Sequence, residues 1–366
     1  MTRVSGSGDL SAADLVLGFG ARQLLSDADV WRRLREKWST ALIVACSTAG
    51  EITGTQVLDD SLALTAIRFD HTVVRCAEVV LREGLSSADV GRLLAEQLLG
   101  IDLAHVFVLS DGLKVNGSEL VAGLTAGLPS HVTLTGGLSG DGARFERTHV
   151  CVNGFDGLQR VAAIGFYGER LKVSFASMGG WDTFGPERRV TRSKDNVLYE
   201  LDGQPALDLY EQYLGEHAAA LPASGLSFPL SVRAARDQPG VVRTILAIDR
   251  EARSLTFAGD VPTGAYAQLM RANFERLVEG AEGAARTCLG GAQASAPELA
   301  ILISCVGRKL VLKQRIEEEV EAVRQVLDET TPLIGFYSYG EISPFTPTAR
   351  CELHNQTMTI TTLSEA

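Results

Sequence analysis

Three short segments combine one acidic residue with glycine and small hydroxyl residues: "CSTAGEI" at 46–52, "GGLSGDG" at 136–142 and "YSYGEIS" at 337–343. Their acids are Glu51, Asp141 and Glu341, and the first and last segments share Gly–Glu–Ile. A carboxylate can hold an ammonium group through a charge-assisted hydrogen bond. A neighbouring glycine lets the backbone approach a bound molecule closely. The three segments therefore predict a small-molecule site lined by acids.

Glu341 has the most suggestive neighbours. Ser338 and Tyr339 offer hydroxyl partners and an aromatic wall to a ligand held by the carboxylate. The alternative is a solvated turn glutamate, or one that accepts a backbone N–H nearby. We expect ligand contacts from Ser338, Tyr339 and Glu341.

The segment around Glu51 follows an apolar run and contains Cys46, Ser47 and Thr48. A nucleophilic cysteine needs a nearby base or cationic surroundings, and the sequence shows neither. We therefore expect Cys46 to be a packed thiol beside the site, with Ser47, Thr48 and Glu51 as ligand contacts. The loop of Asp141 lacks the Lys–Ser/Thr ending of a phosphate-binding loop. Its acid is a third candidate, and an ordinary tight turn is the alternative.

The segment "ELHNQTMTI" at 352–360 places polar residues at the start of an apolar strand. Asn355 and Gln356 carry amide donors and acceptors that suit a carboxylate or an amide of a ligand. The alternative is local hydrogen bonding that secures the loop. His354 is the candidate haem ligand if haem is bound. The other five histidines are scattered without metal-binding spacing.

Composition narrows the class of protein. The 366 residues carry a net charge of −11, which argues against a nucleic-acid or anionic membrane surface. None of the six cysteines forms a C-x-x-C pair, so we expect reduced thiols in the cytoplasm. No signal peptide is evident, and the longest apolar run, 299–307, is too short to cross a bilayer.

Apolar strands alternate with amphipathic helices, which predicts a mixed α+β fold of the α/β type. Helices are expected at 86–100, where Ser86 and Asp89 form a capping box, and at 117–129 and 315–328. Three closely spaced strands, 148–154, 160–168 and 171–179, predict an antiparallel meander.

The strand–helix–strand pattern of 105–138 reappears at 299–338, and each copy ends in a glycine–acid loop. This similarity predicts an internal duplication, with two related sheet-and-helix halves. Ligands of open α/β sheets bind at the carboxyl ends of strands. We therefore expect the three acidic loops to line one cleft between the halves.

The segments "ACSTAGEI", "TLTGGLSGDGARF", "LISCVGR", "PLIGFYSYGEISPF" and "ELHNQTMTI" together resemble the FIST family, a two-part sensory module of microbial signal-transduction proteins. The resemblance implies an N-terminal lead at 1–36, a FIST N-type domain at 37–224 and a FIST C-type domain at 225–366. It also implies an intracellular sensor of small ligands such as amino acids. Some members are haem proteins that sense nitric oxide and regulate histidine kinases.

The expected function is a cytoplasmic sensor that binds an amino-acid-like ligand and signals through a separate protein, such as a histidine kinase. No kinase, methyl-accepting or cyclase segment is recognisable. One alternative is a haem-binding nitric-oxide sensor, although no cofactor is predicted from the residues. A second is an enzyme that uses paired carboxylates, although no catalytic motif is recognised. We expect neither nucleic acid nor membrane as a partner.

Overall fold

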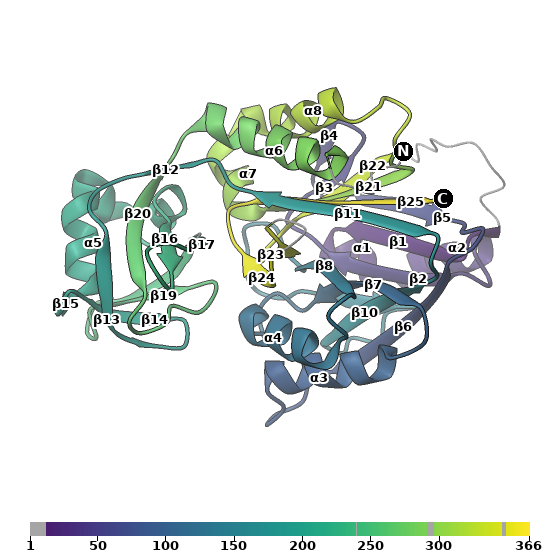
Figure 1. Ribbon diagram of the computed structural model, residues 1–366, viewed down its shortest axis with the longest axis horizontal. Coiled ribbons are helices and arrows are strands. Elements are labelled where there is room, and N and C mark those ends of the chain that lie inside the picture. The colour runs from purple at the N-terminus through teal and green to yellow at the C-terminus, as the bar shows by residue number, and fades with distance from the viewer. Residues whose placement is uncertain (1–11, 239, 291–295, 346–348) are drawn as a thin grey trace.

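The computed structural model describes residues 12–238, 240–290, 296–345 and 349–366. The chain forms a larger core domain and a smaller inserted lobe, residues 181–272 (Figure 1). The lobe leaves the core domain after β11 (Leu171–Met178) and returns at α6 (Phe274–Leu289). The boundary expected between residues 224 and 225 falls within this lobe.

Three sheets make up the core domain. Sheet A has the order β5–β1–β2–β9, with the bounds Leu62–Ile67, Leu15–Gly20, Leu42–Ser47 and Val150–Val152. Sheet B has the order β11–β25–β21–β22–β3–β4; the bounds after β11 are Met358–Glu365, Leu299–Cys305, Leu333–Ser338, Glu51–Thr53 and Gln56–Leu58. Sheet C has the order β24–β23–β8–β7–β10–β6, with the bounds Cys351–His354, Gly340–Pro344, Thr133–Leu138, Leu103–Ser110, Arg160–Tyr167 and Val73–Val80.

The lobe has its own sheet and its own hydrophobic cluster. Its main order is β17–β16–β20–β13–β14–β19–β18, with the bounds Val241–Arg243, Leu230–Arg233, Tyr266–Ala272, Arg188–Lys194, Val197–Leu201, Ser254–Phe257 and Ile245–Asp249. Two short strands, β12 (Trp181–Thr183) and β15 (Gln204–Pro205), pair with β20 and β14.

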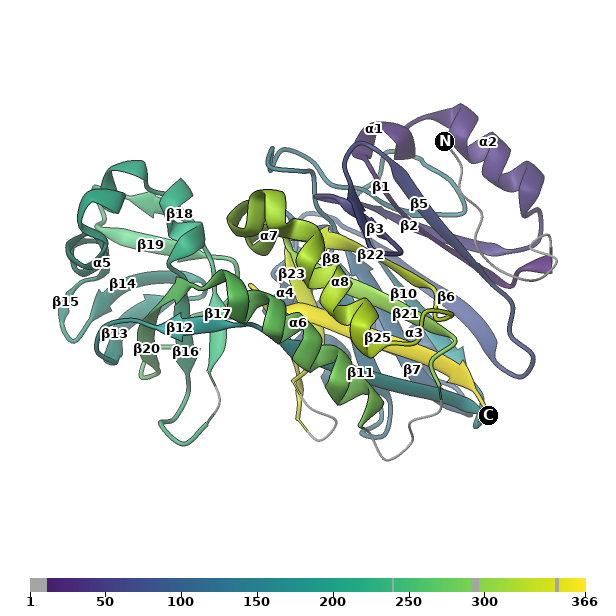
Figure 2. The ribbon, with the colours of Figure 1, turned by 90° about the horizontal axis from the view of Figure 1, so that it is seen from above.

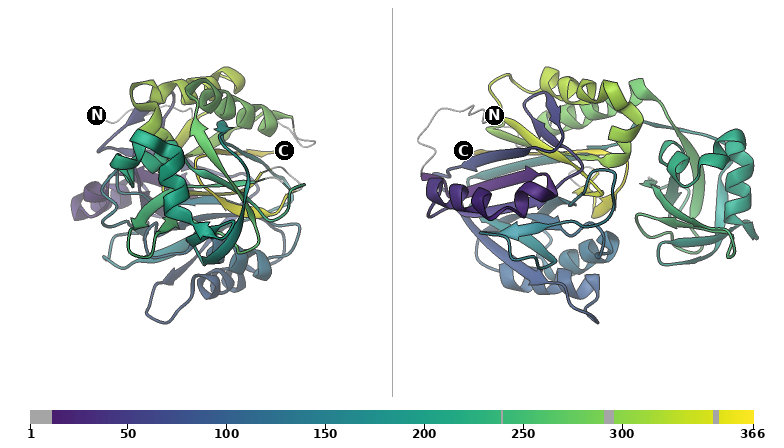
Figure 3. Two further views of the ribbon diagram at one scale, coloured as in Figure 1. Left: turned by 90° about the vertical axis from the view of Figure 1, so that its left-hand side faces the viewer. Right: turned by 180° about the vertical axis from the view of Figure 1, so that it is seen from behind.

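Helices cover the outer faces of the sheets. The remaining α-helices are α1 (Arg22–Leu25), α2 (Ala28–Lys37), α3 (Ser87–Leu98), α4 (Gly117–Gly127), α5 (Ala206–Leu214), α7 (Val306–Leu312) and α8 (Ile316–Val326). Short 3₁₀ helices are η2 (Gly215–Ala220), η3 (Ala223–Ser227) and η4 (Lys313–Arg315). Helices α6 and α8 lie over sheet B, whereas α3 and α4 lie over sheet C on the opposite side (Figures 1 and 3).

The apolar runs of the central strands are explained by burial on both faces. In β1, Leu17 and Phe19 point into a cluster shared by all three sheets, whereas Val16 packs under α2. In β7, Phe107 joins the shared cluster and Val108 packs under the helices of sheet C. The sheets thus surround one inner core. Figure 2 shows α2 on the outer side of sheet A, far from the lobe.

The core domain repeats one unit three times. In each sheet two parallel strands, β1–β2, β7–β8 or β21–β22, are joined through helices, and an antiparallel strand flanks the first of them. After the second strand the chain crosses to another sheet. Strand β3 pairs with β22, β23 pairs with β8, and β9 pairs with β2, which closes a cycle.

The mixed α+β fold is confirmed, and so is the match between 105–138 and 299–338. The cycle adds a third unit, which begins inside the segment expected to be an N-terminal lead. Residues 15–20 form β1, which is fully buried between β2 and β5. Its sequence "LVLGFG" contains two glycines and follows a Ser/Gly-rich stretch, and both features weaken the strand signal.

The capping box of α3 is confirmed, because the Ser86 side chain accepts the Asp89 N–H. The predicted antiparallel meander is wrong. Strand β9 belongs to sheet A, β10 to sheet C and β11 to sheet B. Short connections usually join neighbouring strands, but here they turn the corners between sheets, which spacing along the chain does not reveal.

Candidate functional site

The loops that follow β2, β8 and β22 meet at one end of the core domain. Each of them is joined to the next by backbone hydrogen bonds, which form a closed ring. The bonds run from Ala49 N–H to Tyr337 O (2.8 Å), Gly140 N–H to Ser47 O (2.8 Å) and Tyr339 N–H to Leu138 O (3.1 Å). The three predicted loops therefore converge, at the carboxyl ends of their strands.

A cavity of about 270 Å³ lies beside these loops, between the core domain and the lobe. We call it the interlobe cavity. The core domain contributes the segments 112–116 and 305–307 together with Tyr339 and Asn355, and the lobe contributes Thr244, Leu246 and Phe257. Its position agrees with the rule that ligands of such sheets bind at the strand ends.

Asn355 is the most informative residue of this cavity. Its side chain is fully buried, yet within the described residues neither its amide nitrogen nor its amide oxygen has a hydrogen-bond partner. The buried hydroxyl of Thr244, across the cavity, also has none among the described residues. Buried polar groups are almost always hydrogen-bonded. A bound molecule or ordered water is therefore expected to complete both groups.

The remaining wall is largely apolar. The rings of Phe145 and Tyr339 stack at 4.4 Å with an interplanar angle of 17°, and both line the cavity. Leu246 and Phe257 face it from the lobe. Lys114, which is exposed, adds a positive charge at the rim.

Glu341 does not line the cavity, but it lies two residues after Tyr339, which does. Its Oε1 accepts the Ser338 hydroxyl at 2.6 Å, and its Oε2 accepts the Thr357 hydroxyl at 3.0 Å and the Thr357 N–H at 3.3 Å. Burial raises the pKa of Glu341 to about 8, although these donors oppose the shift. Both oxygens are thus engaged by the protein.

Glu51 lines a second cavity of about 340 Å³ at the neighbouring loop junction, together with Thr48 and Lys309. Its Oε1 accepts the Thr48 hydroxyl at 2.5 Å, and its Oε2 accepts the Ser61 hydroxyl at 2.6 Å. Burial raises the pKa of Glu51, and the hydrogen bonds partly offset it. Gly50 has a φ of 140°, and a Cβ there would collide with the Lys309 amine.

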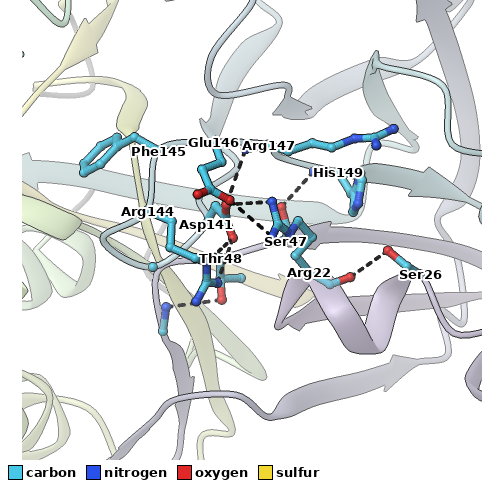
Figure 4. A network of polar contacts seen from close by, with 12 residues as sticks. Arg22, Ser26, Ser47, Thr48, Asp141, Arg144, Phe145, Glu146, Arg147 and His149 are labelled. Atoms are coloured by element: carbon cyan, nitrogen blue, oxygen red, sulfur yellow. Dashed lines mark hydrogen bonds and ion pairs between the residues drawn. The ribbon is translucent and has the colours of Figure 1, made fainter.

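Asp141 belongs to a third loop junction, which an ion-pair network fills (Figure 4). Its carboxylate pairs with Arg144 at 2.7 Å and Arg22 at 3.1 Å, and it accepts the Arg147 N–H at 3.3 Å. Beside it, the Ser47 hydroxyl accepts a backbone N–H at 2.8 Å. The arginines balance the charge that a ligand ammonium would otherwise meet.

Gln356 ties the lobe to the core domain. Its side-chain NH₂ donates to the Leu226 carbonyl at 3.2 Å, and the backbone carbonyl of Gln356 accepts the indole N–H of Trp181 at 2.9 Å. Cys46 is fully buried in the inner core, where burial raises its thiol pKa. That environment is typical of a packed structural thiol.

His354, the candidate haem ligand, is enclosed by the protein in this geometry. The ring is fully buried, its Nε2 lies 2.7 Å from the Ser343 carbonyl, and Phe345 packs edge-on at 4.2 Å. It lines neither of the two cavities described above. Its Nδ1 has no hydrogen-bond partner among the described residues, and haem ligation by His354 stays a prediction.

The sequence did not single out the cavity residues Lys114 and Thr244. Thr244 lies between two short strands in "VVRTILAID", where a threonine is unremarkable. Its missing partner is visible only after folding. Lys114 could not have been identified from its position in the sequence either, because a single surface lysine carries no signal.

In the described part of the chain, no group of three or more His, Cys, Asp or Glu side chains is placed to hold a metal ion. Among the same residues, no helix is long and apolar enough to span a membrane. All six cysteines are free thiols.

A small, largely apolar cavity with a few converging polar groups is typical of a small-molecule-binding protein. The FIST N domain matches residues 14–204, and the FIST C domain matches residues 206–344. The chain therefore belongs to the FIST family. FIST domains are sensory domains of signal transduction that bind small ligands.

Two individual proteins give weaker likenesses. An uncharacterized protein of Methanocaldococcus jannaschii is 25% identical over 327 residues, which cover 82% of this chain and 60% of that protein. The chain thus spans about 60% of that relative's length. A crystal structure of a cyanuric acid hydrolase from A. caulinodans aligns with 80% of this chain and 99% of its own, at 11% identity and a TM-score of 0.19. A TM-score that low carries no argument about fold or activity.

Proposed function

We propose that this FIST protein is a sensor whose ligand, a small amino-acid-like metabolite, occupies the interlobe cavity. The observation that carries the proposal is the fully buried Asn355 amide, which has no protein partner among the described residues. The cavity volume of about 270 Å³ lies near the lower end of ligand sites, which span about 300–1,000 Å³. That size favours a metabolite over a nucleotide.

The polar groups suit a zwitterion. The Asn355 side chain can donate to a carboxylate through its NH₂ group and accept from an ammonium through its oxygen. The Thr244 hydroxyl can do either, and Lys114 favours the carboxylate end by charge. The stacked Phe145 and Tyr339 rings would contact an apolar side chain of the ligand.

The signal would come from the position of the lobe. Direct hydrogen bonds between the two bodies are few, and a ligand held by both Asn355 and Thr244 would add to them. Binding would therefore favour the docked lobe, and a separate cytoplasmic partner such as a histidine kinase would recognise that arrangement. These bonds include Asn116 Nδ2 to Asp260 Oδ1 (3.0 Å), Arg243 Nη1 to Leu353 O (2.9 Å), Gln356 Nε2 to Leu226 O (3.2 Å) and Trp181 Nε1 to the backbone carbonyl of Gln356 (2.9 Å).

The test is a thermal-shift screen against L-amino acids and related metabolites. A ligand at a hundredfold excess over its Kd stabilises the folded protein by about 2.7 kcal/mol. We expect Asn355→Leu and Thr244→Val to lose this shift. Thr256→Val, a threonine of the same lobe outside the cavity lining, is the matched control and should keep it.

The stability of the empty variants sharpens the test. Because Asn355→Leu removes a buried polar group without a protein partner, its free energy of unfolding should stay within about 1 kcal/mol of wild type. Loss of the ligand shift in a well-folded variant then reports on binding. A shift that survives in both cavity variants, or no shift with any compound at millimolar concentration, would contradict the proposal.

The alternatives have their own readouts in the same samples. A Soret band in protein produced with adequate iron would favour the haem sensor. Chemical conversion of the bound compound, followed by chromatography, would favour the enzyme. We expect a colourless protein that returns its ligand unchanged.

A further inference from the structure

The turn at residues 355–357, between β24 and β25, presents Asn355 to the interlobe cavity. Its central residue, Gln356, has a φ of +64°, a backbone conformation that residues other than glycine adopt infrequently. Such a backbone persists only where its surroundings hold it. The contacts that fix this turn therefore decide where the Asn355 amide points.

One carboxylate supplies much of that hold. The Oε2 of Glu341 accepts both the N–H and the hydroxyl of Thr357, the last residue of the turn. Its Oε1 accepts the hydroxyl of Ser338, which directly precedes Tyr339 of the cavity wall. Glu341 thus joins two separate segments that line the core-domain side of the cavity.

We propose that Glu341 is a positioning residue of the interlobe cavity, which sets the orientation of Asn355 through Thr357. The effect of Glu341 on a ligand rests on the proposed function. Its hold on the 355–357 turn does not, because the turn is held in the same way when no ligand is bound. Glu341 would thereby influence a ligand that it does not touch.

The anchor should depend on pH. The charged and titratable groups that face Glu341 are Cys305, Arg308 and His354. Burial raises the thiol pKa of Cys305 and lowers the pKa of His354 to about 4, so both stay neutral near pH 8. Arg308 is paired with Glu319 at 2.7 Å.

Glu341 itself has a pKa of about 8. Above this pH the carboxylate accepts charge-assisted hydrogen bonds from Thr357, which are stronger than those to a neutral acid. Below it, the protonated carboxyl can donate to the Ser338 hydroxyl and holds Thr357 less firmly. The Asn355 amide should therefore sense the ionisation of Glu341.

The side-chain NH₂ signals of Asn355 report this directly and need no ligand. In full-length protein labelled with ¹⁵N-asparagine, they are identified as the pair absent from Asn355→Asp. We expect them to titrate in the wild type with a midpoint near 8. Glu341→Gln should abolish the titration, because its amide does not ionise there. Glu51→Gln, the matched change in the other Gly–Glu–Ile segment, should leave it intact.

Thr357→Val provides a second test of the same titration, which remains possible if Glu341→Gln does not fold. It removes one donor to the carboxylate, so the midpoint should rise by about 0.5–1 pH unit. Flat Asn355 signals in the wild type, a titration that persists in Glu341→Gln, or its loss in Glu51→Gln would each overturn the proposal. None of these results depends on the screen, so the failure of one proposal is distinguishable from that of the other.

Discussion

The two Gly–Glu–Ile segments occupy equivalent places in the three-unit cycle, yet their glutamates have different surroundings. Glu51 begins the strand that crosses to sheet B, and Glu341 lies at the start of the strand that crosses to sheet C. Glu51 binds Ser61, in the connection between β4 and β5, whereas Glu341 binds Thr357 beneath the interlobe cavity. The same local sequence thus anchors a connection in one unit and a candidate binding turn in the other.

The adjacent residues Arg308 and Lys309 extend this contrast, since each serves one of the two regions. Arg308 is fully buried, pairs with Glu319 and donates to the carbonyls of Gly179 and Leu277. Lys309 donates to the Ala49 carbonyl at 2.9 Å and pairs with Asp59, which is 68% exposed. One cation is therefore integral to the core, and the other lies at its surface.

The largest expected effect is that of Arg308→Leu. Removing one partner of a buried ion pair leaves Glu319 uncompensated, which costs about 3–5 kcal/mol. Urea unfolding monitored by circular dichroism would measure this as a lower midpoint at an unchanged slope. A loss below 1 kcal/mol would show that the Arg308–Glu319 pair contributes little to stability.

The pH dependence of stability should distinguish the two glutamates next. The folded pKa of Glu341, about 8, exceeds the ordinary value of 4.5. Between these values the folded state holds a proton that the unfolded state has lost, so stability falls as pH rises, by at most about 1.4 kcal/mol per pH unit for this one group.

Glu341→Gln should remove that fall. The measurement is the difference in unfolding free energy between wild type and variant from pH 5 to pH 9. Glu51→Gln should change the profile in the same direction, because burial also raises the pKa of Glu51, but less, because its carboxylate lines a cavity. If both variants had the same dependence of unfolding free energy on pH, the expected difference between Glu341 and Glu51 would be contradicted.

A ligand found in the screen gives the third comparison. We expect Glu341→Gln to weaken it about three- to tenfold above pH 8, which corresponds to the loss of one charge-assisted bond in the turn. Glu51→Gln should change the Kd less than twofold. Isothermal titration calorimetry on both variants would decide, and equal weakening would contradict a role specific to Glu341.

The smallest expected effect is that of Lys309→Leu. Its ion pair with an exposed carboxylate contributes about 0–1 kcal/mol. The loss in unfolding free energy should therefore stay within about 1 kcal/mol, well below that of Arg308→Leu. A loss as large as that of Arg308→Leu would show that Lys309 stabilises the fold as much as the buried Arg308–Glu319 pair does.

The sequence was sufficient for much of the fold. Continuous apolar runs predicted the central strands, helical periodicity predicted α3, α4 and α8, and strand-end position predicted that the acidic loops meet. The expectation that all three acids line one cleft is wrong, because Glu51 lines the second cavity, whereas Glu341 and Asp141 line neither of the two cavities described above. Three features of the fold escaped prediction. Strand β1 is interrupted by glycine, the corners between sheets have no local signature, and the lobe is built from short strands whose pairing is set by packing.

The candidate site was harder to predict for a physical reason. Spacing indicates which residues share a loop, but not which atoms they bind. Glu341, Asp141 and Glu51 all have their oxygens engaged by protein donors, whereas Asn355 does not, and only the folded structure distinguishes them. Whether any of these residues contacts a ligand stays a prediction.

The cyclic exchange of strands has a consequence for synthesis on the ribosome. Strand β8 (Thr133–Leu138) gains its neighbour β23 (Gly340–Pro344) only when the last portion of the described chain has been translated. Until then one side of sheet C exposes unpaired backbone groups, which invite pairing with other nascent chains. Correct assembly therefore favours quick completion of translation, or a chaperone that shields this unfinished edge in the meantime.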